Sequence, residues 1–102
     1  MIGQRAKPVV LRGTQNQHVR ALMAWFNEHQ GVHAAIAPHN AALDPVGSER
    51  IEVRGPPRGQ GQPGWLLGLI VCTDNQVHVS FFEAHYRQLF STAISRLRER
   101  FG

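Results

Sequence analysis

The run of residues 65–73 constrains the fold of this chain more than any other segment. It is almost wholly apolar, rich in branched side chains and interrupted by Gly68. The run is far shorter than the roughly 20 residues that a membrane-spanning helix needs. A short apolar run of this composition is typical of a central β-strand that is covered on both faces. The chain is therefore expected to fold around a sheet.

Two neighbouring segments alternate between apolar and polar residues. Residues 50–54 place Ile51 and Val53 opposite charged side chains, and residues 77–81 alternate in the same way. Both patterns are typical of half-buried strands. The stretch of residues 55–64 consists largely of glycine and proline, which cannot continue a helix or a strand ladder. It is predicted to be the long, flexible loop of a hairpin between the first of these strands and the central one.

An amphipathic helix is predicted before the strands. Thr14 and Gln17 have the spacing of a capping box, in which each residue satisfies the backbone of the other. Apolar residues then recur at helical spacing, and Gly31 is a plausible stop. The pattern predicts a helix over residues 15–30.

A second, longer helix is predicted after the strands. Ser80 and Glu83 form another capping-box pattern, and a continuous apolar stripe follows from Phe82 to Phe101. Both helices need an apolar face to cover, and the sheet offers one.

The expected fold class is therefore α+β, a two-layer sandwich in the order helix, three-stranded antiparallel sheet, helix (αβββα). A chain of 102 residues fits one domain spanning residues 1–102. Residues 7–12 could add an N-terminal edge strand, so residues 1–13 are expected to be a flexible arm or that strand. Residues 32–48 remain ambiguous, because residues 32–37 could be a strand and the rest carries turn-forming residues.

Composition narrows the classes of partner. Eleven basic residues against seven acidic ones give a net charge of +4, a modest field that attracts nucleic acid or acidic proteins. The single cysteine, Cys72, excludes an internal disulfide framework and a zinc site built on several thiolates. Residues 1–13 lack the apolar core of a secretory signal, so a cytoplasmic protein without a membrane partner is expected.

The residues that could carry chemistry form no recognised motif. Cys72 lies inside the most apolar run, which indicates a small core residue rather than a nucleophile. The glycines of residues 55–64 lack the Lys and Ser/Thr of a phosphate-binding loop. Enzymatic activity is therefore not expected, and no catalytic residue is assigned.

Six histidines raise the question of a metal site. His29 and His33 are four residues apart, but Gly31 is expected to end the helix between them and so to remove the geometry of paired ligands. His78 and His85 lie near the last strand–helix junction without a recognised ligand spacing. No metal or cofactor is expected, and a His-based, metal-dependent hydrolase is the second alternative function.

Nonspecific binding of RNA or DNA is the first alternative function. Residues 54–59 (R-G-P-P-R-G) resemble arginine–glycine segments that bind RNA through charge and stacking. The order of elements is similar to that of double-stranded-RNA-binding domains, but residues 81–89 lack the Gly and Lys cluster that opens the last helix of that family, and no family is assigned. The candidate nucleic-acid-binding residues are Arg5, Lys7, Arg12, Arg54, Arg58, Arg87, Arg96, Arg98 and Arg100.

Surface residues of the two helices favour a protein contact. Trp25 lies at the margin of the apolar stripe of the first helix, and a partly exposed Trp flanked by imidazoles makes a good contact anchor. The alternative is that Trp25 covers the edge of the sheet. The face opposite the stripe of the second helix is small and nearly neutral, and it could pack against a partner or remain solvated. The candidate contact residues are Trp25, His18, His29, Gln88, Ser91, Thr92 and Ser95.

The leading prediction is a small, non-catalytic binding protein that docks onto a macromolecular partner, either a protein or a nucleoprotein. A homodimer is compatible with the same surfaces. Small basic chains without motifs are typical of accessory proteins of phages and mobile elements that modulate or inhibit host machinery, an association rather than a physical inference.

Overall fold

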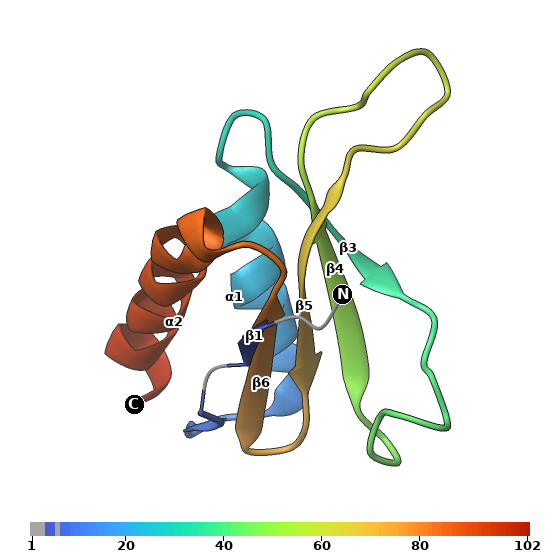
Figure 1. Ribbon diagram of the computed structural model, residues 1–102. Helices are drawn as coiled ribbons and strands as arrows, with labels where there is room; N and C mark the ends of the chain where they lie inside the picture. The colour runs from blue at the N-terminus through green and yellow to red at the C-terminus, as the bar shows by residue number, and fades with distance from the viewer. Residues whose placement is uncertain (1–3, 6) are drawn as a thin grey trace.

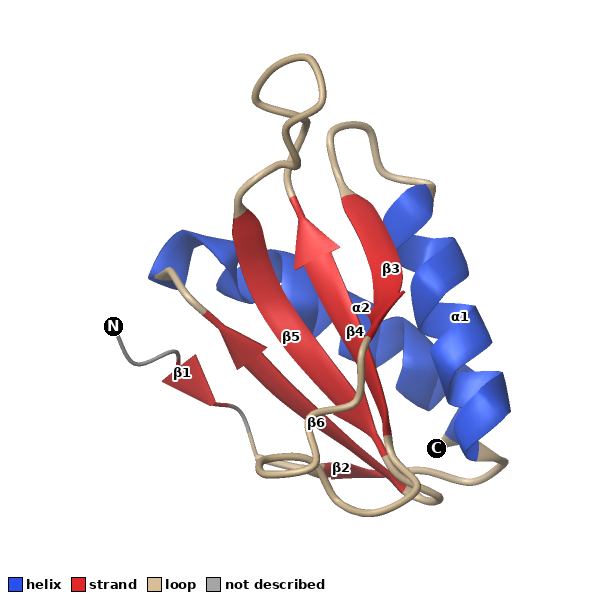
Figure 2. Ribbon diagram, turned by 90° about the vertical axis from the view of Figure 1, so that its right-hand side faces the viewer, coloured by secondary structure: helices blue, strands red, loops and turns tan. Residues whose placement is uncertain are grey.

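An antiparallel sheet with two helices on one face makes up the fold (Figures 1 and 2). The computed structural model describes residues 4–5 and 7–102. The elements in chain order are β1 (Gln4–Arg5), β2 (Val9–Val10), α1 (Gln15–Asn27), β3 (His33–Ala37), β4 (Glu49–Arg54), β5 (Leu66–Cys72), β6 (Gln76–Phe81), a 3₁₀ turn η1 (Ala84–Tyr86) and α2 (Arg87–Phe101). The expected α+β class is confirmed.

The strand count of the prediction is wrong. The strands follow the order β1-β6-β5-β4-β3, and β2 also pairs with β6, so the sheet extends the three expected strands at both edges. β3 lies in the segment that the sequence left ambiguous. Three of its five residues are alanine, which has little strand preference, so no alternating pattern marks it. The optional N-terminal strand is present as the two short pieces β1 and β2.

The core lies between the sheet and the helices. Ile51, Ile70 and Val79 are paired across β4, β5 and β6 and point toward the helical layer, where all three are buried. The helices contribute buried aromatic rings to this core. The ring centroids of Phe26 and Phe90 lie 5.4 Å apart. α1 packs over β3 and β4, whereas α2 packs over β6. This arrangement buries the apolar stripes of both helices against one face of the sheet.

Gly68 lets α2 approach the centre of the sheet. A Cβ atom at this position would lie 2.5 Å from the ring of Phe90 and 2.6 Å from the carbonyl oxygen of Ser80. Both distances are shorter than any ordinary carbon contact. Glycine at this position of β5 is therefore a packing requirement, although it weakens an isolated strand.

Helix α1 begins as predicted and ends early. The Thr14 backbone N–H donates to Gln17 Oε1 (2.9 Å), and the Gln17 N–H donates to Thr14 Oγ1 (3.2 Å), so the capping box is confirmed. The helix stops at Asn27, whose side chain accepts from the Ala34 N–H (2.8 Å) and donates to the Ala34 carbonyl (3.0 Å). This amide therefore pairs with β3 as a neighbouring strand would.

The capping box predicted at Ser80 and Glu83 is wrong. Ser80 is paired with Leu69 inside the sheet, and α2 begins at Arg87 after the turn η1. Tyr86 occupies the cap position without a side-chain hydrogen bond. The backbone bonds of β6 take precedence over a local capping contact, which sequence spacing alone cannot show.

Residues 55–64 connect β4 and β5 as the predicted hairpin loop. Gly59 and Gln62 form an isolated β-bridge inside it, and the Gly55 N–H donates to the Trp65 carbonyl (2.9 Å) at its base. Figures 1 and 2 show that the loop projects well beyond the end of the sheet.

Replacing Gly68 with alanine should destabilise the protein. The added methyl group would force Phe90 or β6 to shift, and overpacking of this kind lowers the free energy of unfolding by about 2 kcal/mol. Gly59→Ala is the control, because a Cβ atom there meets nothing within 4 Å. Urea denaturation of both variants measures the difference. Equal midpoints for the two variants would contradict the packing role of Gly68.

Candidate functional site

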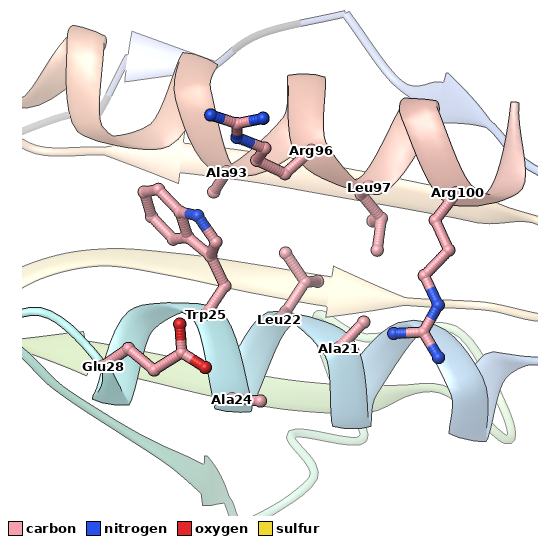
Figure 3. A pocket seen from close by; sticks show the side chains of 9 residues that line it. All are labelled: Ala21, Leu22, Ala24, Trp25, Glu28, Ala93, Arg96, Leu97 and Arg100. Carbon is pink, nitrogen blue, oxygen red and sulfur yellow. The ribbon is translucent and has the colours of Figure 1, made fainter.

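A groove runs between α1 and α2 on the outer side of the helical layer. Its volume is about 230 Å³. The floor is apolar and nearly sealed, because Leu22, Ala93 and Leu97 are 1%, 2% and 3% exposed. The residues that line the groove are Ala21, Leu22, Ala24, Trp25, Glu28, Ala93, Arg96, Leu97 and Arg100 (Figure 3). The groove is therefore a preformed, apolar surface depression with polar side chains at its rim.

Trp25 forms one wall of this groove. Figure 3 shows its indole reaching from α1 toward Ala93 of α2. The ring is half-buried and meets Phe26 edge-on at 5.0 Å and His29 at 4.1 Å. The His29 Nδ1–H donates to the Trp25 carbonyl (2.8 Å), which fixes the imidazole beside the indole. Trp25 thus packs on the core at one edge and remains accessible at the other.

The rim of the groove carries more positive than negative charge. Arg96 and Arg100 come from α2 and Glu28 from α1. Arg96 also pairs with Glu99 at 3.3 Å, but both of these side chains are more than 60% exposed, so solvent weakens the pair. In Figure 3, Arg100 extends from α2 toward Ala21 of α1 and crosses the end of the groove. The two guanidinium groups are available to an acidic ligand.

The structure brings only part of the predicted contact set together. Trp25 and His29 are in contact, but His18 is completely buried, so it is not available to a partner. His18 donates from Nε2 to the Arg12 carbonyl and packs its ring edge-on against Phe101 at 5.0 Å. Its position on the helical margin suggested exposure, whereas the C-terminal end of α2 covers it.

The other half of the predicted set faces away from Trp25. Ser91 and Ser95 line a second groove, of about 290 Å³, between α2 and the β6 edge of the sheet, together with Lys7 and Arg98. Gln88 donates to Thr92 Oγ1 (3.2 Å) on the exposed surface. The serine-rich face and the Trp25 groove are therefore separate surfaces.

The candidate nucleic-acid-binding residues are dispersed. Arg54 pairs with Glu52 at 2.8 Å on the sheet, and Arg58 lies over the Trp65 ring at 3.9 Å on the hairpin loop. Arg96 and Arg100 border the α1–α2 groove, whereas Lys7 and Arg98 border the second one. Arg12 and Arg87 are exposed at other positions, and the side chain of Arg5 lies outside the described residues. These residues do not form one continuous basic surface.

The sheet face opposite the helices is partly covered by the segment that joins β3 to β4. Figures 1 and 2 place this segment on the open side of the sheet. Its Asp44 is buried and accepts two hydrogen bonds from Arg50 of β4, at 3.0 Å from Nε and 2.9 Å from Nη2. The expectation that β5 is covered on both faces is confirmed only in part: Ile70 is buried under the helices, whereas Leu69 and Val71, which alternate with it, are half-buried.

The Asp44–Arg50 pair has a direct electrostatic consequence. Hydrogen bonding from Arg50 holds the pKa of Asp44 below its ordinary value of 3.8, against the opposing effect of burial. The Asn40 N–H also donates to Asp44 Oδ2 (2.9 Å) and lowers this pKa further. Arg50 is therefore committed to a structural contact and is not free for a ligand.

The described histidines form no metal-binding cluster, and Cys72 is buried. In the described part of the chain, no group of three or more His, Cys, Asp or Glu residues could hold a metal ion. His85 and Glu83 approach to 3.2 Å, but both are exposed. Cys72 is fully buried, and burial raises the pKa of its thiol to about 12. A thiol in this state is a poor nucleophile.

Comparison with known proteins assigns no family to this chain. No family model matches it, and no match is found among curated proteins or solved structures. Neither helix in residues 4–5 and 7–102 is long and apolar enough to cross a membrane.

Sequence reasoning identified Trp25 but missed the rest of its groove. Ala21 and Ala24 precede Trp25 on α1, and Ala93 faces them from α2. Small residues at these positions leave the space that the groove occupies. Arg96 and Arg100 were assigned only to the nucleic-acid alternative, because sequence spacing does not show that α1 lies beside them.

Asp44→Asn should destabilise the protein in a pH-dependent way. The folded-state pKa of Asp44 lies below 3.8, so the stabilisation is present above that pH and is lost as the pH falls through the folded-state value. At pH 7 we expect a loss of about 2 kcal/mol in the free energy of unfolding, which shrinks on acidification. Glu99→Gln is the control, since its pair with Arg96 is exposed. If the difference in free energy of unfolding between Asp44→Asn and the wild type stayed constant as the pH was lowered below 3.8, the ion pair would be contradicted.

Cys72 should be unreactive in the folded protein. At pH 8, the raised pKa of about 12 leaves very little thiolate, and the side chain is out of contact with solvent. We expect a thiol-specific chromogenic reagent to modify the protein only after unfolding in urea. Modification of the native protein at the rate seen in urea would contradict the buried position.

Proposed function

We propose that this protein is a non-catalytic binding module that docks onto a partner protein through the groove between α1 and α2. The observation that carries the proposal is the half-buried Trp25 beside an apolar floor, with Arg96 and Arg100 at the rim. Tryptophan and arginine are the residue types that most often dominate the binding energy of protein interfaces.

The groove is suited to a short segment rather than to a large flat surface. Its floor is already desolvated and its walls are helices, so binding would cost little conformational entropy in ordering the site. Figure 3 shows that side chains from both helices border it. An apolar side chain of the partner would lie on the floor against Trp25.

Charge selects the chemistry of the occupant. Arg96 and Arg100 face the single lining acid Glu28, and the exposed pair of Arg96 with Glu99 is weak, so the two guanidinium groups favour a segment that carries aspartate or glutamate beside its apolar anchor. Such a segment would place its acids near Arg96 and Arg100. Binding of this segment in the groove would modulate or inhibit the partner protein, which is the role expected for an accessory protein. Self-association through the same groove remains a prediction.

Charge reversal should abolish this binding without unfolding the protein. We expect a random peptide library, selected on the immobilised protein, to yield sequences rich in Asp or Glu with Leu, Met or an aromatic residue. The double variant R96E/R100E should bind these peptides at least about tenfold more weakly, because each partner acid then meets a like charge. R87E/R98E is the matched control, since it reverses two arginines of the same helix outside the groove.

The two tryptophans allow the site of binding to be read directly. In W65F, Trp25 is the only remaining tryptophan, so its fluorescence reports the groove. A shift of this signal on peptide addition supports the proposal, and Trp25→Ala should weaken peptide binding. Selected peptides that bind R96E/R100E and the control equally, or that leave Trp25 unaffected, would overturn it.

A further inference from the structure

The hairpin between β4 and β5 presents an exposed tryptophan where its loop meets β5. Trp65 stands at the base of this loop and is 68% exposed. Figures 1 and 2 show the loop extending past the ends of the neighbouring strands and helices. Tryptophan offers a large, flat aromatic face, and this residue type is enriched at binding surfaces.

The guanidinium group of Arg58 covers one face of the Trp65 ring. Its guanidinium carbon lies 3.9 Å from the centre of the Trp65 ring, and its Nε–H donates to the Pro63 carbonyl (3.0 Å). The bond from Nε fixes the guanidinium in place and leaves its two terminal nitrogens directed elsewhere. Since Trp65 stays 68% exposed with one face covered, the other face is open to solvent.

The loop carries only positive charge. Between Val53 and Thr73 the sequence contains two arginines and no acid. Arg54 is neutralised by Glu52 and also donates to the Gly64 carbonyl (3.2 Å), so it braces the loop. Within the part of the chain that the structure describes, no carboxylate forms an ion pair with Arg58. Arg58 is therefore the uncompensated cation of the hairpin.

We propose that Trp65 and Arg58 form a stacking platform for single-stranded nucleic acid. A base would stack on the open face of Trp65, and a neighbouring phosphate would accept hydrogen bonds from the terminal nitrogens of Arg58. This pairing of an aromatic ring with a cation is the minimal unit by which proteins bind single strands without reading sequence.

The surroundings of Trp65 favour a base over an apolar peptide. Residues 55–64 consist of Gly, Pro, Gln and Arg58, with no aliphatic or aromatic side chain apart from the proline rings. A peptide anchor would find no apolar pocket here, whereas a planar base needs only one open ring face. Gln60 and Gln62 are exposed on the same loop and can donate to or accept from base edges. The platform is independent of the α1–α2 groove and of the function proposed for that groove.

Fluorescence of a single-tryptophan variant tests the platform. In W25F, Trp65 is the only tryptophan, and titration with a short single-stranded oligouridylate should quench it as bases stack on the ring. The same titration of W65F should leave Trp25 unchanged. Affinity should fall steeply with added salt, because phosphate contacts release counterions.

Substitutions of Arg58 separate stacking from simple charge. R58Q should weaken oligouridylate binding at least about fivefold, because it removes the charge-assisted hydrogen bonds to the phosphate. R58K should fall between wild type and R58Q, since it keeps the charge but not the planar group. R20Q removes an exposed arginine on α1 and is the matched control.

Three results would overturn the proposal. The first is the absence of Trp65 quenching at low salt, and the second is equal loss of affinity in R58Q and R20Q, which would indicate diffuse charge alone. The third is quenching of Trp65 by the selected acidic peptides rather than by oligouridylate, which would assign the hairpin to a protein partner. The first two results leave the test of the α1–α2 groove unaffected, because that test reads Trp25 in W65F and peptide binding in R96E/R100E.

Discussion

The packing of Phe90 against Gly68 sets the spacing between the helical layer and the sheet. The ring lies where a Cβ atom would otherwise stand, and Phe81 stacks with it at a centroid distance of 6.1 Å. With α2 fixed at this depth and α1 anchored beside it by Phe26, the two helices lie next to each other with small residues between them. The groove that holds Trp25 is the space left by that arrangement, so its shape follows from one glycine in the central strand.

The parts of the fold that are periodic in sequence were predictable, and the parts decided by tertiary competition were not. Alternation identified β4 and β6, and the apolar stripes identified both helices. β3 was left as one possibility for residues 32–37 because alanines carry no alternating signal, and the start of α2 was misplaced because Ser80 pairs within the sheet rather than capping a helix. The site follows the same rule: helical position marked Trp25 as a contact residue, but only the fold shows that His18 is buried and that Arg96 lies across from Trp25.

The two tryptophans occupy opposite kinds of environment. Trp25 is wedged between helices over a sealed apolar floor, whereas Trp65 stands on a glycine- and proline-rich hairpin with one cation against its face. The first environment suits a peptide segment with an apolar anchor. The second suits a nucleotide, whose flat base can stack on Trp65 and whose phosphate carries negative charge. A single partner that engages both surfaces would have to contain protein and nucleic acid, which is the composition of a nucleoprotein complex.

The amide of Asn27 has a consequence for the behaviour of the chain at high concentration. β3 is the outer strand of the sheet and contains no charged residue, proline or bulge to discourage pairing with another molecule. Asn27 bonds both backbone groups of Ala34, the second residue of β3, and so occupies part of that edge. One carboxamide thus blocks part of an open strand, and protection of this edge from pairing with another molecule depends on a side chain that belongs to a helix.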